Sequence, residues 1–281
     1  MKEEVIVSAV QMPIKLLDVE KNINYIINSI VKAKSEYNAD LVVFPELSDI
    51  GYIKEKDKKF ARQYVKLAKK IPGPYTDELS KQAKKYGIYL VIGLAEKHPE
   101  IPGMLYNSAV LISPNGELIG KYRKVHIPEE EKHYFMPGNL FEIYNTDIGN
   151  IGIAICYDGY MPEYPRILAI KGVEILCICW NIASANLINP PELLEYMTAT
   201  RAAENRIFVV SSNCIGVQGK INFFGHSLIA DPVGNIISKA GTKETIISAV
   251  LKEEILLEER AQLPIFRDRR PEIYSYLVKS L

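Results

Sequence analysis

Apolar residues recur along the chain with two alternating spacings, one typical of β-strands and the other typical of amphipathic helices. Runs rich in β-branched residues predict strands at Val5–Val10, Leu41–Phe44, Ile88–Gly93, Ser108–Ser113, Ile151–Cys156, Ile175–Cys179, Phe208–Ser212, His226–Asp231 and Thr245–Val250. Apolar positions three and four residues apart predict helices at Asp18–Tyr37, Lys58–Lys70, Thr76–Tyr86, Pro162–Lys171, Pro191–Asn205 and Lys252–Ala261. We expect Asp18 and Thr76 to cap helices at their N-termini, and Gly87 and Gly172 to end helices. This alternation predicts an α/β fold.

Two segments, Ser113–Tyr122 and Asp231–Gly241, each place a Pro-x-Gly turn between apolar runs, which predicts a β-hairpin. One hairpin ends the first half of the chain and the other ends the second half. This arrangement predicts an architecture that repeats itself, with two β-rich layers stacked between helices. No convincing linker interrupts the pattern, so we predict one domain over residues 1–261 and a C-terminal extension over residues 262–281.

The composition is that of a globular protein and argues against several partners. Of the 281 residues, 48% are hydrophobic and 24% are charged, and 34 basic residues balance 34 acidic ones. A net charge of zero lacks the basic excess that nucleic acids or anionic membranes attract, so we expect neither partner. The N-terminus has no long apolar stretch of the signal-peptide kind, and the longest apolar region, Ile175–Leu187, is too short and too polar to cross a bilayer.

The four cysteines occur in a chain without secretory features, which predicts reduced thiols and a cytoplasmic location. None has the CxxC partner typical of a zinc site. Cys177 and Cys179 lie in an apolar run and would share one face of a strand, so we expect them to be small core residues.

Three short segments each join a strand-like run, or its edge, to one reactive side chain. They are Leu41–Leu47 with Glu46, Lys121–Pro128 with Lys124, and Gly152–Gly159 with Cys156. Cys156 ends an apolar strand and precedes a helix predicted to begin near Pro162. Because helix N-termini favour anions, we expect a thiolate to be stabilised there. The alternative, that Cys156 is one more buried apolar cysteine, is favoured by composition alone.

Glu46 and Lys124 each have a functional and an ordinary interpretation. A carboxylate directly after a hydrophobic strand is poorly solvated unless it faces a cleft, and desolvation raises its pKa toward that of a general base near neutrality. A surface glutamate at a strand end is an equal alternative. An ammonium beside a thiol would lower the thiol pKa and stabilise an oxyanion, whereas Lys121, Arg123 and Lys124 together also read as a solvated basic loop.

Successive motifs in the chain resemble the signatures of the nitrilase superfamily of carbon–nitrogen hydrolases. They are FPE, YRKVHIP, EKHYFMPG and ICYDGYMPE, followed by RAAENRIFVVSSNCIG and FFGHSLIADPVGNII. The resemblance runs from about Val5 to Val250, and several motifs in one order are far more specific than a single motif. It implies a four-layer α-β-β-α sandwich. It also implies a homo-oligomer, a dimer or a multiple of dimers, in which the C-terminal extension lies at the subunit interface.

The resemblance implies roles for the reactive residues as well. The family's catalytic triad falls on Glu46, Lys124 and Cys156. A further catalytic glutamate falls on Glu131, with its neighbours Glu129 and Glu130 as alternatives. The ammonium and the backbone N–H of Tyr157 would form the oxyanion hole. In this mechanism the glutamate base takes the thiol proton, the sulfur attacks a carbonyl carbon, and water later releases the acid from a thioester. No metal or organic cofactor is expected.

The residues after Cys156 favour amide hydrolysis over nitrile hydrolysis. Typical nitrilases place tryptophan and glutamate there, whereas the Tyr157–Asp158 pair is more usual in amidases and N-carbamoyl hydrolases. The following Gly-x-x-Pro-Glu resembles aliphatic amidases. The resemblance therefore implies an amidase that releases ammonia or an amine from a small amide or N-carbamoyl compound. The alternative is a nitrilase that converts a small nitrile to an acid and ammonia.

Loops at the same sheet edge are expected to contact the substrate. The candidates are Tyr52, Trp180 and Asn181, and for Trp180 a purely packing role is an equal alternative. Arg166 lies one to two turns into the following helix, so we expect it to pair within the scaffold rather than to clamp a substrate carboxylate. No obvious pair of arginines marks a carbamoyl amino-acid pocket, which favours a small neutral amide.

Three other functions are weaker. A papain-like hydrolase would pair Cys156 with His126, His133 or His226, and it would leave the glutamate and lysine motifs unexplained. A binding protein that inherited the fold would have no use for an intact triad. A glutaminase-like subunit would need a separate synthetase, because the chain has neither a GxGxxG motif nor a P-loop.

Overall fold

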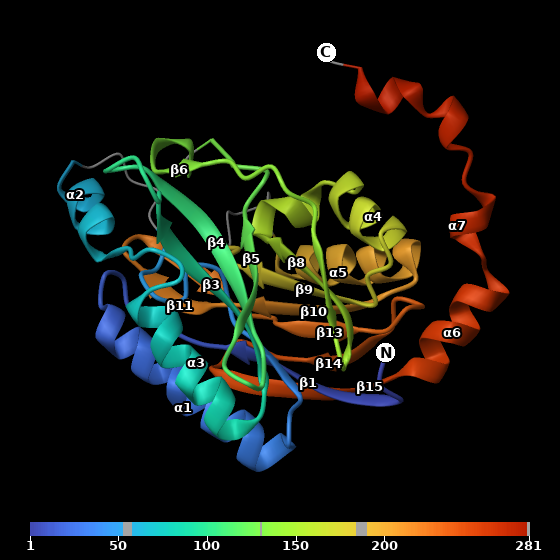
Figure 1. The fold of residues 1–281 in the computed structure, drawn as a ribbon, viewed down its shortest axis with the longest axis horizontal. Helices are drawn as coiled ribbons and strands as arrows, with labels where there is room; N and C mark the ends of the chain where they lie inside the picture. The colour runs from blue at the N-terminus through green and yellow to red at the C-terminus, as the bar shows by residue number, and fades with distance from the viewer. Residues whose placement is uncertain (53–57, 130, 184–189, 280–281) are drawn as a thin grey trace.

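The computed structural model, which describes residues 1–52, 58–129, 131–183 and 190–279, contains two large β-sheets that pack face to face. Helices α1 (Val19–Tyr37) and α3 (Pro74–Tyr86) lie on the outer side of one sheet (Figure 1). Helices α4 (Glu163–Ile170) and α5 (Pro191–Asn205) lie on the outer side of the other sheet. The fold is α/β, as predicted, and helices enclose the pair of sheets.

The first sheet has the strand order β15-β1-β2-β3-β4-β5, with β6 beside β4. Its strands are β1 (Glu4–Gln11), β2 (Leu41–Val43), β3 (Tyr89–Lys97), β4 (Leu105–Ile112), β5 (Leu118–Arg123), β6 (Phe135–Met136) and β15 (Thr245–Lys252). The second sheet has the order β14-β13-β10-β9-β8-β7. Its strands are β7 (Ile143–Thr146), β8 (Gly149–Ile155), β9 (Ile175–Trp180), β10 (Phe208–Asn213), β13 (Leu228–Ala230) and β14 (Ile236–Lys239). A small separate sheet pairs β11 (Ile215–Gln218) with β12 (Ile221–Phe224).

The two sheets repeat one topology. In the first, β1, β2 and β3 are parallel, and β4 and β5 follow as an antiparallel hairpin. In the second, β8, β9 and β10 are parallel, and β13 and β14 follow in the same way. The repeat predicted from the two Pro-x-Gly hairpins is therefore confirmed. Because both sheets have parallel strands at their centres, the residues that follow β2, β8 and β9 come from strand carboxyl ends, where α/β folds place their sites.

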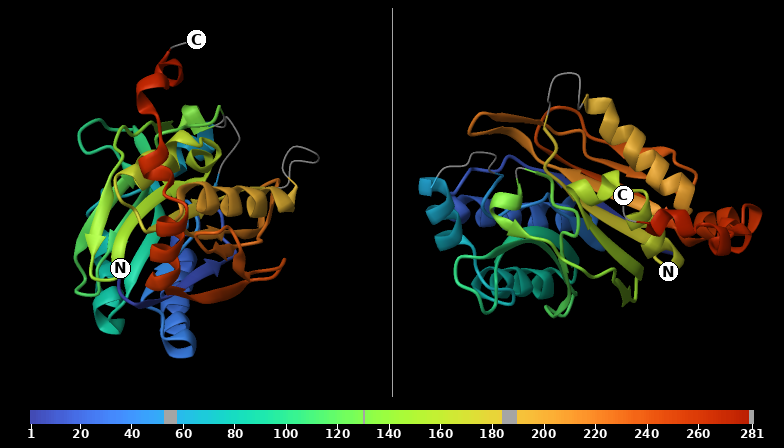
Figure 2. Two further views of the ribbon diagram at one scale, coloured as in Figure 1. Left: turned by 90° about the vertical axis from the view of Figure 1, so that its right-hand side faces the viewer. Right: turned by 90° about the horizontal axis from the view of Figure 1, so that it is seen from above.

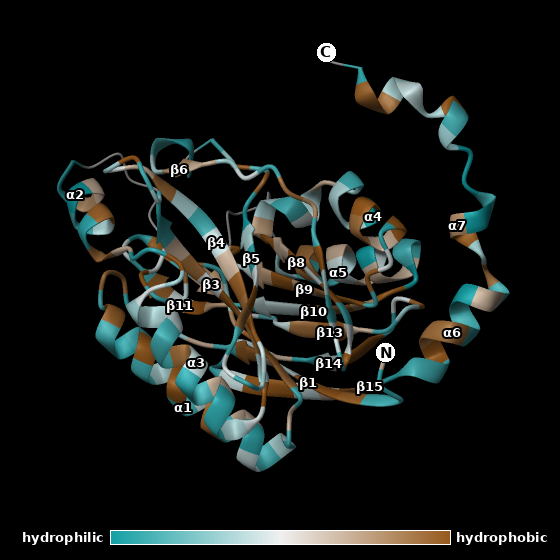
Figure 3. Cartoon of the chain, in the orientation of Figure 1, coloured by the Kyte–Doolittle hydropathy of each residue, from teal (hydrophilic) through white to brown (hydrophobic). Residues whose placement is uncertain are grey.

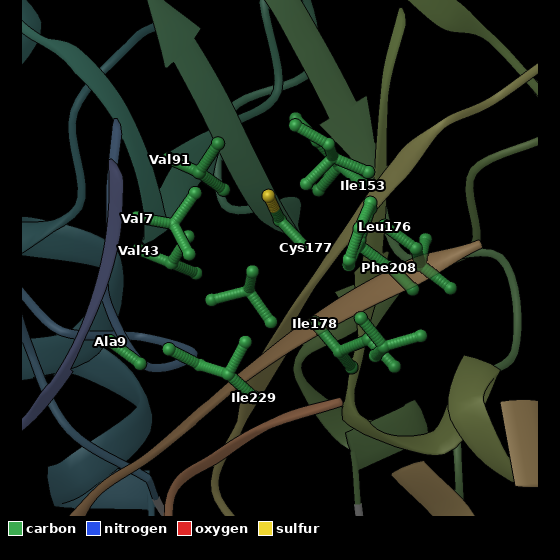
Figure 4. Packing of buried hydrophobic residues seen from close by; sticks show 14 of the residues in the cluster. Val7, Ala9, Val43, Val91, Ile153, Leu176, Cys177, Ile178, Phe208 and Ile229 are labelled. Carbon is green, nitrogen blue, oxygen red and sulfur yellow. The ribbon is translucent and has the colours of Figure 1, made fainter. Parts of the chain in front are cut away.

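The main hydrophobic core lies between the sheets. Figure 4 shows Val7, Val43 and Val91 of the first sheet facing Ile153 and Cys177 of the second. Cys177 and Cys179 are both fully buried, as predicted for small core residues. A second core lies between the first sheet and its helices. In Figure 3 the strands are mostly brown and the outer helices mix brown with teal, which agrees with one buried face per helix.

Most predicted elements are present, and the differences are local. Helix α5 has the predicted bounds, and the Asp18 side chain accepts a hydrogen bond from the Lys21 N–H at the start of α1. The prediction of Thr76 as a helix cap is wrong. Helix α3 begins at Pro74, and the Thr76 hydroxyl instead reaches back to the Gly73 backbone. The short strands β6, β7, β11 and β12 were not predicted, because their residues show little apolar alternation.

The end of the chain has few contacts with the sheets. Helix α6 (Glu253–Gln262) follows β15, and α7 (Ile265–Asp268) and two short 3₁₀ turns extend away from both sheets (Figures 1 and 2). Large apolar residues are exposed there, including Tyr276 at 75% and Val278 at 86%. A search of the described residues for a helix able to cross a membrane finds none.

Candidate active site

The loop after β2 carries Glu46 into the interior. Strand β3 holds this loop, because the Gly93 N–H donates to the Pro45 carbonyl over 3.2 Å and the Ser48 N–H donates to the Gly93 carbonyl over 2.8 Å. The Glu46 side chain is fully buried. The interpretation of Glu46 as a surface residue is therefore wrong.

Burial controls the protonation of Glu46. Burial raises the pKa of Glu46 to about 7, since desolvation and the nearby Glu131 outweigh the opposing effect of Lys124. A carboxyl group with this pKa is divided between its two protonation states at neutral pH, so it can both accept and return a proton.

Lys124 lies between two carboxylates at the end of β5. Its fully buried Nζ donates to Glu46 Oε1 over 2.7 Å and to Glu131 Oε1 over 2.6 Å. Burial alone would lower the pKa of Lys124, but Glu131 and Glu46 raise it overall, so the side chain remains an ammonium ion. The alternative of a solvated basic loop is wrong, because Lys121 and Arg123 lie on β5 and pair with the buried Glu96 carboxylate.

Asn107 of β4 completes this cluster, and sequence reasoning missed it. Its Nδ2 donates to Glu46 Oε1 over 2.6 Å and to Glu131 Oε2 over 3.2 Å. The backbone carbonyl oxygen of Asn107 accepts the backbone N–H of Lys124 over 2.8 Å. The available signal was a polar residue beside the apolar run of a strand, at a position where a buried polar group requires partners.

Glu131 is the buried member of the three candidate glutamates. It is 1% exposed, and its Oε1 also accepts the Tyr52 hydroxyl over 3.1 Å. Glu129 is exposed, and Glu130 lies outside the described residues. The structure therefore brings Glu131 and Tyr52 to the Glu46–Lys124 pair.

Cys156 occupies a sharp turn between β8 and a 3₁₀ segment, Cys156–Tyr160. Its φ is +43°, a conformation that residues with a Cβ rarely adopt and that presents a nucleophile at a strand end. Burial and Glu46 raise the pKa of the thiol well above its usual value, while Lys124 lowers it. The expectation of a stabilised thiolate is wrong, because helix α4 starts only at Glu163 and desolvation dominates.

The residues after β9 border the thiol through their backbone. The Asn181 N–H acts as a hydrogen-bond donor to the Cys156 sulfur and lowers the thiol pKa. Asn181 Nδ2 donates to the Glu46 carbonyl over 2.8 Å, and the Glu46 N–H donates to the Trp180 carbonyl over 3.3 Å. The segment therefore links Glu46 to Cys156.

The rings around this turn pack against one another. The Trp180 ring is fully buried, and its Nε1 donates to the Ser211 hydroxyl over 3.2 Å. A Cβ on Gly159 would lie 2.5 Å from this ring, so the glycine allows the thiol turn to pack closely. The geometry agrees with the packing alternative for Trp180. Tyr157 is partly buried, with its ring 5.4 Å from that of Tyr160.

Two further expectations concern residues outside the cluster. Arg166 donates from Nη2 to the Glu204 carbonyl over 2.6 Å, so it pairs within the scaffold, as expected. Of the histidines that a papain-like enzyme would need, His126 has its Nδ1 2.8 Å from an oxygen of Asp158, and His133 is exposed. By contrast, the buried Glu46 carboxylate interacts electrostatically with the Cys156 thiol.

Comparisons with known proteins give matches over nearly the whole chain. A family model described as carbon–nitrogen hydrolase matches residues 6–256. A nitrilase from Pyrococcus abyssi is 36% identical over 276 residues, which cover 95% of this chain and 98% of that protein. An omega-amidase from Xenopus tropicalis is 32% identical over 256 residues, which cover 88% of each protein. The crystal structure of a carbon–nitrogen hydrolase from Helicobacter pylori G27 superposes with a TM-score of 0.88 at 30% identity and covers 99% of both chains.

Proposed function

The chain belongs to the carbon–nitrogen hydrolase family, and from this premise we propose that it hydrolyses a small amide or N-carbamoyl compound through a thioester on Cys156. The observation that carries the proposal is the buried Lys124 ammonium, which lies between Glu46 and Glu131 and interacts electrostatically with the Cys156 thiol. Burying such charges is costly, and apolar side chains often replace a buried ion pair without loss of stability. A chemical role explains why the cluster is there.

The first half of the reaction forms the thioester. Glu46 takes the thiol proton as the Cys156 sulfur attacks the carbonyl carbon. Lys124 and the Tyr157 N–H stabilise the oxygen that becomes negative. The carbon–nitrogen bond then breaks, and Glu46 returns its proton to the departing ammonia or amine. A base with a pKa of about 7 suits both transfers.

The second half consumes water. Glu46 takes a proton from a water molecule that attacks the thioester carbon, and Glu131 helps to orient this water. The carbon–sulfur bond breaks, the acid departs, and the proton returns to the Cys156 sulfur. In both halves Glu131 and Asn107 hold Lys124 and Glu46 in place through the hydrogen bonds described above.

Unpaired acceptors at the site favour an amide over a nitrile. Among the described residues, three buried oxygens here have no hydrogen-bond partner: Glu46 Oε2, Asn107 Oδ1 and Asn181 Oδ1. A primary amide brings two N–H donors into such a site, whereas a nitrile brings none. A buried acceptor that stays unpaired costs about 1–3 kcal/mol, so the acceptors discriminate against a substrate without donors. Tyr52 and Asn181 would border this substrate, and Trp180 would support them from behind.

A nitrilase activity is the second candidate, and one observation favours it. The relative from Pyrococcus abyssi, which matches nearly the whole chain, is a nitrilase. The same thiol, ammonium and base would serve a nitrile, which forms a thioimidate and consumes two water molecules. The choice between the two activities therefore depends on the acceptors around the leaving nitrogen.

Ammonia release from a substrate panel tests the proposal. The panel contains short aliphatic amides, omega-carboxamides of dicarboxylic acids, N-carbamoyl amino acids and short nitriles, with Cys156→Ala as the blank. We expect release from amides by the wild type alone, and an acyl adduct on Cys156 in acid-quenched protein by mass spectrometry. Release from nitriles only would replace the amidase assignment with the nitrilase one. Normal turnover by Cys156→Ala would contradict the mechanism.

The exposed apolar residues of the C-terminal extension support a homo-oligomer. Ile273, Tyr276 and Leu277 are 63%, 75% and 67% exposed, which is unfavourable in a lone subunit. We therefore expect residues 262–281 to pack against a second copy of the chain. Light scattering of the full chain should give at least a dimer, and removal of residues 271–281 should weaken the assembly. A full-length monomer at micromolar concentration would contradict this.

A further inference from the structure

Asp158 is a fully buried carboxylate two residues after Cys156, and the proposed mechanism does not use it. Its Oδ2 accepts the Ile155 N–H over 3.1 Å and the Tyr122 hydroxyl over 2.7 Å. Ile155 is the last residue of β8, directly before Cys156, whereas Tyr122 belongs to β5. One oxygen thus joins the strand that carries the thiol to the strand that carries the ammonium.

The other oxygen holds the segment after Lys124. Oδ1 accepts the His126 backbone N–H over 2.9 Å and lies 2.8 Å from His126 Nδ1. Because a carboxylate can only accept, we assign the ring proton to Nδ1. The Tyr122 hydroxyl, besides donating to Asp158, accepts the Val125 N–H over 3.2 Å. Asp158 therefore contacts residues on both sides of Lys124 and the residue directly before Cys156.

This set of bonds fixes a distance that neither sheet alone determines. Cys156 directly follows a strand of the second sheet and Lys124 directly follows a strand of the first, so their separation depends on how the sheets pack. The positive φ of Cys156 is strained, and such a conformation persists only where the surroundings impose it. The Ile155–Asp158 hydrogen bond closes the turn that contains this residue.

We propose that Asp158 is a positioning residue, which holds the Cys156 turn against the Lys124 segment through Tyr122 and His126. Without it, the strained turn relaxes and the sulfur moves away from the ammonium and from Glu46. His126 serves here as a hydrogen-bond donor and not as a base. The inference rests on the proposed function for the roles of Cys156 and Lys124, but its test needs no substrate.

The test is the rate at which iodoacetamide alkylates Cys156 in the native full-length protein. Cys177, Cys179 and Cys214 are buried, and Cys156→Ala gives the background. We compare wild type with Asp158→Asn and with Tyr122→Phe, which removes a single hydroxyl. The matched control is Asp231→Asn. Asp231 is also nearly buried and also accepts four hydrogen bonds, but it does so within the β13–β14 turn.

A purely structural role and a positioning role predict different results. We expect Asp158→Asn to lower the alkylation rate at least tenfold and Tyr122→Phe to lower it about threefold. We expect Asp231→Asn to lower the melting temperature but to keep the wild-type rate. Wild-type or faster rates in both Asp158→Asn and Tyr122→Phe would overturn the proposal. If Asp158→Asn does not fold, the double variant Tyr122→Phe/His126→Ala decides by the same tenfold criterion.

A conservative variant separates the donor role of His126 from base catalysis. Asparagine at position 126 keeps an N–H donor near Asp158 but cannot take a proton. We expect His126→Asn to alkylate within threefold of wild type and His126→Ala to be slower. Equally slow His126→Asn and His126→Ala variants would overturn the donor role. Alkylation measures the reactivity of the thiol itself, so this test remains valid even if the protein releases no ammonia from any amide in the panel. If the protein does hydrolyse amides but the variants keep the wild-type alkylation rate, only the positioning role is refuted.

Discussion

Replacing Gly93 with alanine should displace Glu46, the proposed catalytic base, while leaving its side chain unchanged. Gly93 lies in the middle of β3, where the chain passes directly over the Glu46 loop. A Cβ at this position would lie 2.5 Å from the Pro45 carbonyl oxygen, 2.6 Å from the Glu46 Cα and 2.9 Å from the Leu47 nitrogen. All three atoms belong to the backbone, so no side-chain rotation relieves the overlap. The φ of Gly93 is not in the positive region that disfavours alanine, so the steric effect stands alone.

The size of the displacement sets the expected loss. Normal van der Waals contact requires the loop to retreat by about 0.5–0.9 Å, and misplacement of a catalytic group by about 1 Å can cost roughly 100-fold in rate. Glu46 would move relative to Lys124, to which it is now hydrogen bonded over 2.7 Å. We therefore expect kcat to fall about 10- to 100-fold, equivalent to about 1.4–2.7 kcal/mol in the barrier. Overpacking should also lower the free energy of unfolding by about 1–3 kcal/mol.

The assay compares Gly93→Ala with Gly241→Ala, because a Cβ on Gly241 meets no atom within 4 Å. Ammonia release gives kcat, and urea unfolding gives stability. The control should match wild type in both. Wild-type kcat and stability in Gly93→Ala would refute the reasoning, because the loop would then have room that the contact distances deny. Loss of stability with unchanged kcat would show that the base does not depend on the position of this loop.

Three further predictions follow from the same cluster and its surroundings. Because burial raises the pKa of Glu46 to about 7 and the base acts as the carboxylate, kcat/KM should rise with pH through about 7, and a limb near pH 4.5 would contradict this. Glu131→Gln should lower kcat at least 100-fold, whereas Glu129→Gln, at an exposed position, should match wild type in the same assay. The reverse result would assign the fourth catalytic role to Glu129 instead of Glu131. Burial raises the pKa of Asp49 to about 7, so the folded state keeps a proton that the unfolded state loses from about pH 4 upward. The free energy of unfolding should therefore fall as pH rises to about 8. In urea titrations, Asp49→Asn should reduce that fall by about 2–4 kcal/mol. Identical pH curves for the variant and the wild type would contradict this.

The local spacing of apolar residues explains which helices and strands could be predicted. Helix α5 and the strands around the two hairpins follow from the spacing of apolar residues, because a residue's burial in a regular element depends on its neighbours three, four or two positions away. The same logic placed Glu46 and Cys156 at strand ends. Thr76 failed as a helix cap because Pro74, two residues earlier, is itself suited to the first turn of a helix.

The sequence by itself determined the α/β class, its repeated halves and, through ordered motifs, the positions of the thiol, the ammonium and the base. Only the tertiary structure decided what each of these groups experiences. Asn107 joined the cluster, and Glu131 rather than Glu129 became buried, because strands distant in the chain meet there. The thiol pKa rises instead of falling, since desolvation sums over every atom that packs around the sulfur. Local spacing carries no information about that sum, nor about the distance between two sheets that Asp158 spans.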